Sequence, residues 1–523
     1  MMRGEFMNYK NRILPPELKD VKENLISGRK QSKEKKPYEI KIVTPMFGGG
    51  NEPGELDETF PVRSSSIRGH LRFWWRATRG AAFQDVKELR RHEVAIFGDT
   101  HSPSRVKIWV ESRHKPEITD AREIDKNKQV RPGKEPAYRF KNFLPLYAVF
   151  PYTSNNKVRT LRKLTFTLYV QYSDYIPTAK DKVQDNLFPD IEALKKEVEA
   201  ALWAWINFGG IGNRTRRGCG SLFSESFSPK LGEKYASYTD WYEKKQLEYG
   251  LKLLSCEEIG ELGQGWPTLP EEIHIQTYDR DLTLAWKKVI EIYKNFRAFK
   301  AGYKRSMWPE ADSLRLITGM AEGRHKDPLP EDKGKCIAFP RAEMGLPIIF
   351  EFKQDFKLKG MFSDKREPYK TQLIPKGKNR LASPLITKAL AISESRGVGV
   401  IVRLNHPKLD KLELQMVPEK MGRLSKHEEE IKKCHERKVK DRIKQYDITQ
   451  KDIYKELTYS DSPMNMGNKE KPFTSAIDAF LNGKEVEKWK IHRESEKKPY
   501  MGNRNGQNKS YNGRNNYNNR RNT

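Results

Sequence analysis

The chain has 523 residues, of which 36% are hydrophobic, and this length favours two or three domains over a single one. Its 99 Lys and Arg residues outnumber its 70 Asp and Glu residues, and the formal net charge of +29 predicts a polyanionic partner. The last 27 residues hold seven basic residues and no acidic one, so the remainder still carries +22. Because 11% of the residues are aromatic and can stack on bases, nucleic acid is favoured over a membrane surface.

The cysteines and the apolar segments exclude several classes of protein. Cys219, Cys256, Cys336 and Cys434 lie far apart and form no C-x-x-C pair, which argues against a disulfide scaffold and against a zinc site. No metal or other cofactor is expected. The N-terminus lacks the apolar core of a secretory signal, and no run of 18 apolar residues occurs. We therefore expect a soluble cytoplasmic protein with no membrane contact.

The first predicted domain covers residues 37–230 and follows a polar extension, residues 1–36. Residues 38–43 alternate like a strand, and the three serines at 64–66 offer an N-cap for a helix over 67–79. The unit therefore opens as strand, loop and helix.

The rest of this domain completes a recognisable order of elements. Strands are predicted at 106–111 and 164–171, and a Lys- and Pro-rich insertion at 113–136 between them is predicted to be a mobile loop. Apolar residues recur at a spacing of 3.6 over 191–207, which predicts a helix packed on a sheet, and a last strand follows at 221–223. Strand-helix-strand-strand-helix-strand is the order of a ferredoxin-like domain.

A second copy is predicted over residues 273–423, after a linker at 231–272. It opens with a strand at 273–278 and a helix at 283–299. Its other candidates are strands at 346–352 and 398–404 and a helix at 383–394, where Ser383 and Pro384 fit an N-cap and a first helical position.

The C-terminal part completes the predicted architecture. A helical region is expected at 424–496, with one or two surface helices over 424–457, and a disordered Asn- and Arg-rich tail at 497–523. The sequence therefore predicts an α+β fold with two ferredoxin-like (RRM-like) domains, insertions, a helical C-terminal region and a disordered basic tail.

The first candidate site is a stripe of arginines on the helix over 67–79. Stepping about 100° per residue places Arg68, Arg72, Arg76 and Arg79 within one sector of about 80°. Guanidinium groups suit phosphate oxygens because each donates two parallel hydrogen bonds and stays charged. Trp75 borders this stripe and could stack on a base, and Arg63 lies just before the helix. The alternative is a solvated basic face over a buried tryptophan pair.

The second candidate site is a glycine- and arginine-rich segment that follows the helix over 191–207. Glycines would let a phosphate chain approach the backbone closely, and arginines would supply charge. Its candidate RNA-binding residues are Gly209, Gly210, Gly212, Asn213, Arg214, Arg216, Arg217 and Gly218. The segment matches neither a Walker loop nor a dinucleotide-binding loop, which argues against ATP binding. The alternative is a flexible surface loop that happens to be basic.

These segments together resemble the first subunits of Cmr complexes, the type III-B CRISPR effectors, within the RAMP superfamily. The strong matches are Thr44-Pro45-Met46-Phe47 with Gly48 to Gly50, the stretch from Ser66 to Arg76, and the stretch from Gly209 to Ser221. The weaker matches are Phe339 to Ala342, Gly345 to Pro347, and Arg380 to Leu385.

The resemblance implies a non-catalytic RNA-binding subunit. It implies a place at the head of the complex near the 3′ end of the guide RNA, contacts with neighbouring RAMP subunits, and a share in holding guide CRISPR RNA and single-stranded target RNA. Cleavage would belong to other subunits. The residues implied to contact RNA are Arg68, Arg72, Arg76, Arg214, Arg216 and Arg217.

Two other functions remain open from the sequence. Related RAMP proteins cut RNA without metal by activating a 2′-hydroxyl with a histidine, and His70 is the candidate base here. On the helical wheel, however, His70 falls roughly opposite the arginine stripe. The other alternative is a stand-alone RNA-binding protein that relies on its charge and tail. No cluster of acids with the spacing of a two-metal site is evident.

Overall fold

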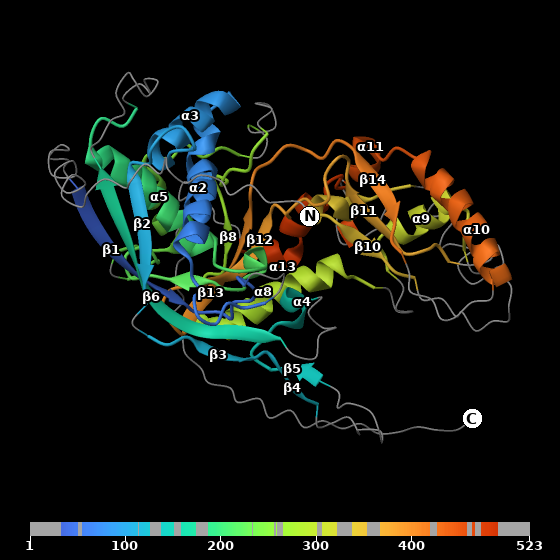
Figure 1. Ribbon diagram of the computed structural model, residues 1–523, viewed down its shortest axis with the longest axis horizontal. Coiled ribbons are helices and arrows are strands. Elements are labelled where there is room, and N and C mark those ends of the chain that lie inside the picture. Colours follow the sequence, from blue (N-terminus) through green and yellow to red (C-terminus); the bar gives the residue numbers. More distant parts are fainter. Residues whose placement is uncertain are drawn as a thin grey trace, which may run out of the picture.

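In the computed structural model, the described residues are 33–50, 55–112, 114–125, 138–150, 158–173, 187–232, 234–255, 258, 265–300, 306–321, 337–352, 367–418, 426–457, 463–465 and 472–489. The expected N-terminal extension, up to residue 32, and the expected disordered tail lie outside these residues. Within them, no helix is long and apolar enough to cross a membrane. The fold is mixed α and β with antiparallel sheets (Figure 1).

The first sheet joins strands that are distant in the sequence. Its main strands lie side by side in the order β2 (Val106–Glu111), β6 (Arg159–Ser173), β1 (Lys33–Ile42) and β7 (Leu222–Phe223). Each neighbouring pair is antiparallel. Opposite residues share a face, and Pro37, Tyr169 and Trp109 form one such row across three strands.

Two helices cover one face of this sheet, as Figure 1 shows. They are α2 (Ser64–Arg79) and α5 (Ile191–Phe208). The Asp190 side chain caps α5 by accepting a hydrogen bond from the backbone N–H of Ala193. Both predicted helices and all four predicted strands of this unit are confirmed, and their order along the chain is strand-helix-strand-strand-helix-strand.

The stretch predicted as a mobile loop at 113–136 is partly a sheet. Strand β3 (Glu117–Asp120) pairs with β6, and β4 (Arg122–Ile124) pairs with β5 (Tyr138–Phe140). The prediction of a loop was wrong there because strands of three or four residues are too short to show a periodicity. The remainder of that stretch, from residue 126, lies outside the described residues.

A second sheet has the order β12, β13, β8, and β9 also pairs with β13. Its strands are β8 (His274–Ile275), β9 (Arg280–Asp281), β12 (Leu385–Ala391) and β13 (Arg396–Arg403). Helix α8 (Leu282–Arg297) packs on β12 and β13. The core on this side also includes α12 (Ala476–Leu481) and α13 (Lys484–Glu487).

The predicted helix over 383–394 is wrong, because that stretch forms the strand β12. All seven residues of β12 are buried, since α5 packs on the strand in addition to α8. A strand that is covered on both faces has no alternation of apolar and polar residues, so its apolar run cannot be distinguished from a helix by period. Ser383 and Pro384 precede the strand instead of capping a helix.

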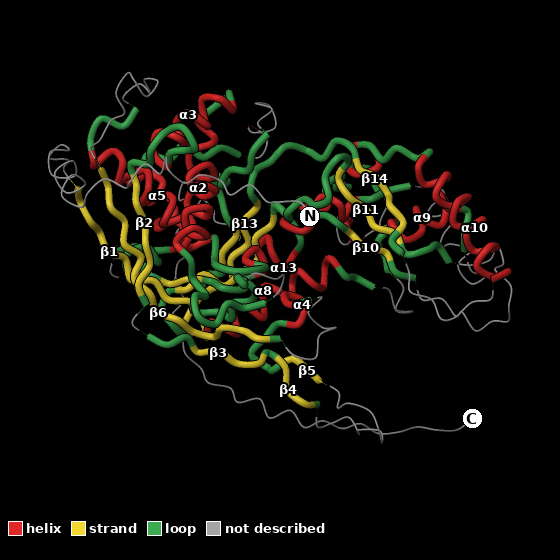
Figure 2. Tube along the Cα trace, viewed as in Figure 1, coloured by secondary structure: helices red, strands yellow, loops and turns green. Residues whose placement is uncertain are grey.

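A third sheet lies at the opposite end of the molecule from β1 (Figure 2). Its strands are β10 (Ile348–Phe350), β11 (Thr371–Pro375) and β14 (Leu412–Met416). The strands predicted at 346–352 and 398–404 therefore both exist but belong to different sheets. The helices beside it are α9 (Glu310–Thr318), α10 (Lys426–Lys444) and α11 (Gln450–Ile453), of which the last two confirm the helices predicted over 424–457.

Four α-helices of the described residues were not predicted. They are α3 (Val86–Phe97), α4 (Leu146–Val149), α6 (Tyr238–Tyr249) and α9. Of these, α3 lies beside α2 in Figure 1 and decides how the arginine stripe is used.

Candidate nucleic-acid interface

The arginine stripe of α2 contacts α3 through a buried carboxylate. The Glu93 side chain is only 3% exposed, and its two oxygens lie 2.5 Å from Arg72 Nε and 2.8 Å from Arg76 Nη1. Glu93 is held there because α3 packs against α2 and presents its buried face to it. The single negative charge of Glu93 is therefore shared by two guanidinium groups and compensates about one of their two positive charges within the protein.

The C-terminal end of α3 binds the remaining donors of the stripe. Arg68 donates to the carbonyl of Phe97, and Arg72 Nη1 donates to the carbonyl of Gly98 at 2.9 Å. These carbonyls lie at the negative end of the helix dipole, so they attract cations. Burial, and then the neighbouring Arg72, lower the pKa of the Arg68 guanidinium. Arg68, Arg72 and Arg76 thus join two helices.

The other residues predicted around α2 are also engaged. Trp75 is 1% exposed, and its Nε1 donates to Glu197 at 2.8 Å, so its ring offers no face to a base. Arg63 lies 2.6 Å from Asp57, whose pKa is lowered by the Phe60 backbone N–H and by this guanidinium. The alternative interpretation of the sequence, a basic face over buried tryptophans, describes this helix better than a base-stacking site.

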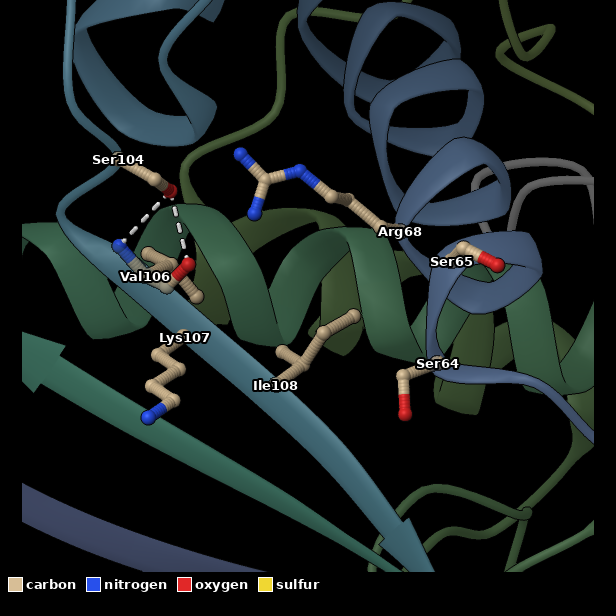
Figure 3. Close-up of a pocket in the computed structure, with 7 residues that line it drawn as sticks. All are labelled: Ser64, Ser65, Arg68, Ser104, Val106, Lys107 and Ile108. Atoms are coloured by element: carbon tan, nitrogen blue, oxygen red, sulfur yellow. Dashed lines mark hydrogen bonds between the residues drawn. The ribbon is translucent and has the colours of Figure 1, made fainter. Parts of the chain in front are cut away.

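Figure 3 shows a pocket of about 320 Å³ between the start of α2 and β2. Its lining residues are Ser64, Ser65, Arg68, Ser104, Val106, Lys107 and Ile108. The Ser104 hydroxyl donates to the Val106 carbonyl at 2.8 Å, and Arg68 reaches across the pocket from α2. The Lys107 side chain points away from Arg68, to the other side of β2.

The glycines of the second candidate site are required for packing inside the protein. A Cβ on Gly212 would lie 2.5 Å from the Phe47 carbonyl, and one on Gly218 would lie 2.5 Å from Trp286 Nε1. Both have positive φ angles, 82° and 78°. Gly209 and Gly210 are buried beneath them, while Asn213 is exposed and its backbone N–H donates to Phe47. Close packing within the protein therefore requires Gly212 and Gly218.

A buried lysine holds this segment to the second sheet. Lys388, in the middle of β12, is 0% exposed, and its Nζ donates to the Gly209 carbonyl at 2.7 Å. Burial lowers the pKa of Lys388 to about 7. Trp286 of α8 adds a bond of 2.7 Å to the Arg217 carbonyl. The segment is therefore a rigid joint between the two sheets.

The arginines of this segment line a pocket of about 300 Å³ together with residues of α8, of β12 and of two segments outside the sheets. We call it the arginine pocket, and its basic members are Arg214, Arg216, Arg217, Arg297 and Arg380. The segments 344–347 and 380–385, which belong to the weaker motifs of the sequence, form its other wall. Three motifs that are far apart in the sequence therefore meet at one site.

The lining of the arginine pocket is basic. Of the described residues that line it, five are arginines and none is Asp or Glu. Arg216 donates to the Ser383 carbonyl, Arg217 to the Tyr147 carbonyl at 3.2 Å, and Arg297 to the Met344 carbonyl at 3.1 Å. Carbonyl oxygens orient a guanidinium without neutralising it, so the pocket concentrates positive charge that a phosphate group can satisfy.

Arg297 and Arg380 were missed as site residues by the sequence reasoning. Arg380 is exposed and has no hydrogen bond or ion pair within the described part of the chain. Its place at the start of the weaker motif was the available signal. Arg297 gave none, because it is the last residue of the amphipathic helix α8.

His70 of α2 is not among the residues that line the arginine pocket. Its ring stacks on Trp205 of α5 at a centroid distance of 6.0 Å, and burial lowers the pKa of its imidazole. Among the described residues, no group of three or more His, Cys, Asp or Glu side chains is arranged to hold a metal ion.

Comparison with known proteins finds a family model that matches the first unit. Residues 39–223, which span the first sheet with α2 and α5, match the model of the RAMP superfamily. Among curated proteins, the chain is 27% identical over 186 residues to Cmr subunit Cmr1-2 of Pyrococcus furiosus, which covers 35% of this chain and 92% of that protein. It is 30% identical over 199 residues to Cmr subunit Cmr1-1 of the same organism, which covers 38% of this chain and about half, 51%, of that protein. The resemblance to first subunits of Cmr complexes is confirmed.

Two solved structures are also similar to this chain. The crystal structure of apo Cmr1 from Pyrococcus furiosus has a TM-score of 0.35 at 19% identity, covering 75% of this chain and 92% of that one. A cryo-EM structure of the type III-B Cmr-β complex bound to cognate target RNA contains a chain with a TM-score of 0.38 at 13% identity, covering 79% of this chain and 100% of that one.

Proposed function

We propose that this chain is a non-catalytic RNA-binding subunit of a type III-B (Cmr) CRISPR effector complex. The observation that carries the proposal is the arginine pocket, in which Arg216, Arg217 and Arg297 donate to carbonyl oxygens and no described lining residue is an acid, so that positive charge remains for a phosphate backbone. The names of the two curated relatives, both Cmr subunits, support the assignment to this complex. In this proposal the partners are guide CRISPR RNA, single-stranded target RNA and neighbouring RAMP subunits.

The proposal extends to architecture and position. The strand order β2-β6-β1-β7 with α2 and α5 on one face fits a ferredoxin-like domain over 37–230, and β12-β13-β8 with α8 fits a second over 273–423. The subunit would lie at the head of a cytoplasmic complex, near the 3′ end of the guide RNA, and would leave cleavage to other subunits.

Within the interface, the proposal assigns different roles to the two arginine groups. Arg214, Arg217 and Arg380 contact phosphates, and Arg216 and Arg297 shape the pocket from its buried side. Arg68, Arg72 and Arg76 hold α3. A ribonuclease based on His70 is not favoured, because the ring packs on Trp205.

The test is affinity purification of the tagged chain from its native host, with bound proteins identified by mass spectrometry and bound RNA sequenced. Other RAMP subunits and repeat-derived guide RNA should be recovered, and cellular RNA without them would favour a stand-alone RNA-binding protein. Arg217→Gln with Arg380→Gln should lower the affinity of the purified chain for RNA by about 10- to 100-fold, since charge-assisted contacts are lost. The log-log salt slope should fall by about 0.7 per lost contact.

The matched control is Lys378→Gln with Lys411→Gln. Both lysines are exposed and neither lines the arginine pocket, so the net charge changes equally. This control should retain its affinity. Equal losses in the two double variants would show that charge alone, without the pocket, governs binding.

A further inference from the structure

The face of the first sheet that is turned away from α2 and α5 has a regular pattern of side chains. Because opposite residues share a face, Lys35, Gln171 and Lys107 form one row across β1, β6 and β2. Pro37, Tyr169 and Trp109 form the next row. We call these six residues the open sheet face. Between the two rows, Val170 and Ile108 pack in the core shared with α2 and α5, and Lys36 pairs with Glu199 of α5.

Two aromatic rings stand together at the centre of this face. Trp109 and Tyr169 are stacked at a centroid distance of 5.2 Å with an interplanar angle of 14°. Lys35 Nζ lies 4.0 Å from the Tyr169 ring and 4.9 Å from the Trp109 ring. Both rings are half-buried and Lys35 is exposed. The Trp109 indole N–H also donates to Glu111 at 3.2 Å, and part of each ring surface remains accessible to solvent.

The charge on this face changes from basic to acidic along the strands. Neither row of the open sheet face contains an acid, and its two lysines lie on β1 and β2, on either side of β6. The next row holds Glu39 and Glu111 at corresponding positions, with Thr167 between them. Figure 3 shows the Lys107 side chain on the side of β2 opposite Arg68, in agreement with its place on this face.

We propose that the open sheet face is a second nucleic-acid site, which binds a short stretch of single-stranded RNA. Trp109 and Tyr169 stack on unpaired bases, and Lys35 and Lys107 contact phosphates along the row beside the rings. Stacking needs bases that are not paired in a duplex. The two lysines lie on the strands that flank β6, which suits an RNA strand that crosses β1, β6 and β2. The glutamates of the next row repel phosphates and limit the path. The site shares no residue with the arginine pocket and does not depend on the function proposed for it.

Tryptophan fluorescence can locate the site, because most of the other tryptophans are inaccessible. At most 4% of the surface is exposed at Trp74, Trp75, Trp203, Trp205, Trp241, Trp286, Trp308 and Trp489. Trp266 is partly buried and donates to the Gly80 carbonyl. An unlabelled 12-nucleotide oligouridine should therefore quench mainly the fluorescence of Trp109. In Trp109→Phe, which keeps an aromatic ring, this quenching should disappear while binding measured by anisotropy of a labelled oligouridine is retained within about threefold.

The matched pair of variants tests affinity. Trp109→Ala with Tyr169→Ala should weaken binding of labelled oligouridine by at least about fivefold, with an unchanged circular dichroism spectrum. Tyr278→Ala is the control, because Tyr278 is 64% exposed and also lies beneath a cation, Arg280, at 5.0 Å. It should bind as the unmodified chain does.

Three results would overturn the proposal. They are quenching that persists in Trp109→Phe, an affinity that is unchanged in the double alanine variant, and an equal loss in Tyr278→Ala. Loss of a protein subunit from the purified complex in the double variant, with oligouridine binding intact, would assign the face to a protein partner instead. Each result is independent of the arginine pocket variants, so the two sites can fail separately.

Discussion

The α2 stripe and the arginine pocket are both rich in guanidinium groups, but these groups have different partners. On α2, the Arg72 and Arg76 guanidinium groups meet Glu93, which is almost fully buried. In the arginine pocket, Arg217 and Arg297 meet carbonyl oxygens, and no acid lies among the described lining residues. A carboxylate neutralises a guanidinium, whereas a carbonyl only orients it. The comparison teaches that arginine density alone does not identify a phosphate site, because the partner of each arginine decides its availability.

The largest expected effect is on stability, when the Glu93 carboxylate that pairs with the α2 arginines is replaced. Glu93→Gln removes the charge that faces Arg72 and Arg76 and should lower the free energy of unfolding by about 3 kcal/mol, because it leaves cations half-buried and unpaired. Urea denaturation measures this loss. Glu88→Gln, a half-exposed acid on the same helix that pairs with the half-exposed Arg91, is the control and should change stability by less than about 1 kcal/mol. A similar small loss for Glu93→Gln would mean that these arginines are not structural.

An intermediate effect is expected at the joint beneath the arginine pocket. Burial lowers the pKa of Lys388 to about 7, so between pH 7 and pH 10 the unfolded chain binds a proton there that the folded chain does not. The free energy of unfolding should therefore rise with pH through this window, by about 1.4 kcal/mol per pH unit from this group. Lys388→Met removes the contribution, so its stability relative to the unmodified chain should fall as the pH rises.

The measurement for Lys388 is urea denaturation of both proteins at pH 7, 8 and 9. Lys378→Met, at an exposed position, should show no such divergence. Parallel stability curves for Lys388→Met and the unmodified chain would show that this lysine stays protonated in the fold.

The smallest effect is expected for the α2 arginines in RNA binding. Arg68→Gln with Arg72→Gln should change the log-log salt slope for RNA by less than about 0.7, the value for one single-strand phosphate contact. Their donors already bind Phe97, Gly98 and Glu93. Binding isotherms at several salt concentrations measure the slope. A decrease of about 1.4 would restore the sequence prediction that this stripe contacts RNA directly.

Much of the first unit could be predicted because its elements are periodic and half-buried. The alternation of β1 and the 3.6 spacing of α5 each report one buried face, and both were predicted from these patterns. The strand β12 could not be, because burial on both faces removes the alternation. Helix α3 was also missed, although the Asp85 side chain caps it, since its segment is rich in charged residues.

The sequence by itself determined the charge, the order of elements in the first unit, and the segments that resemble first subunits of Cmr complexes. Only the tertiary structure decided which arginines keep their charge available. It brought Glu93 to the α2 stripe, and it placed Arg380 beside Arg217 across about 160 residues of sequence. The physical reason is that a side chain's charge is a local property of the sequence, whereas its compensation depends on neighbours that packing brings from elsewhere in the chain.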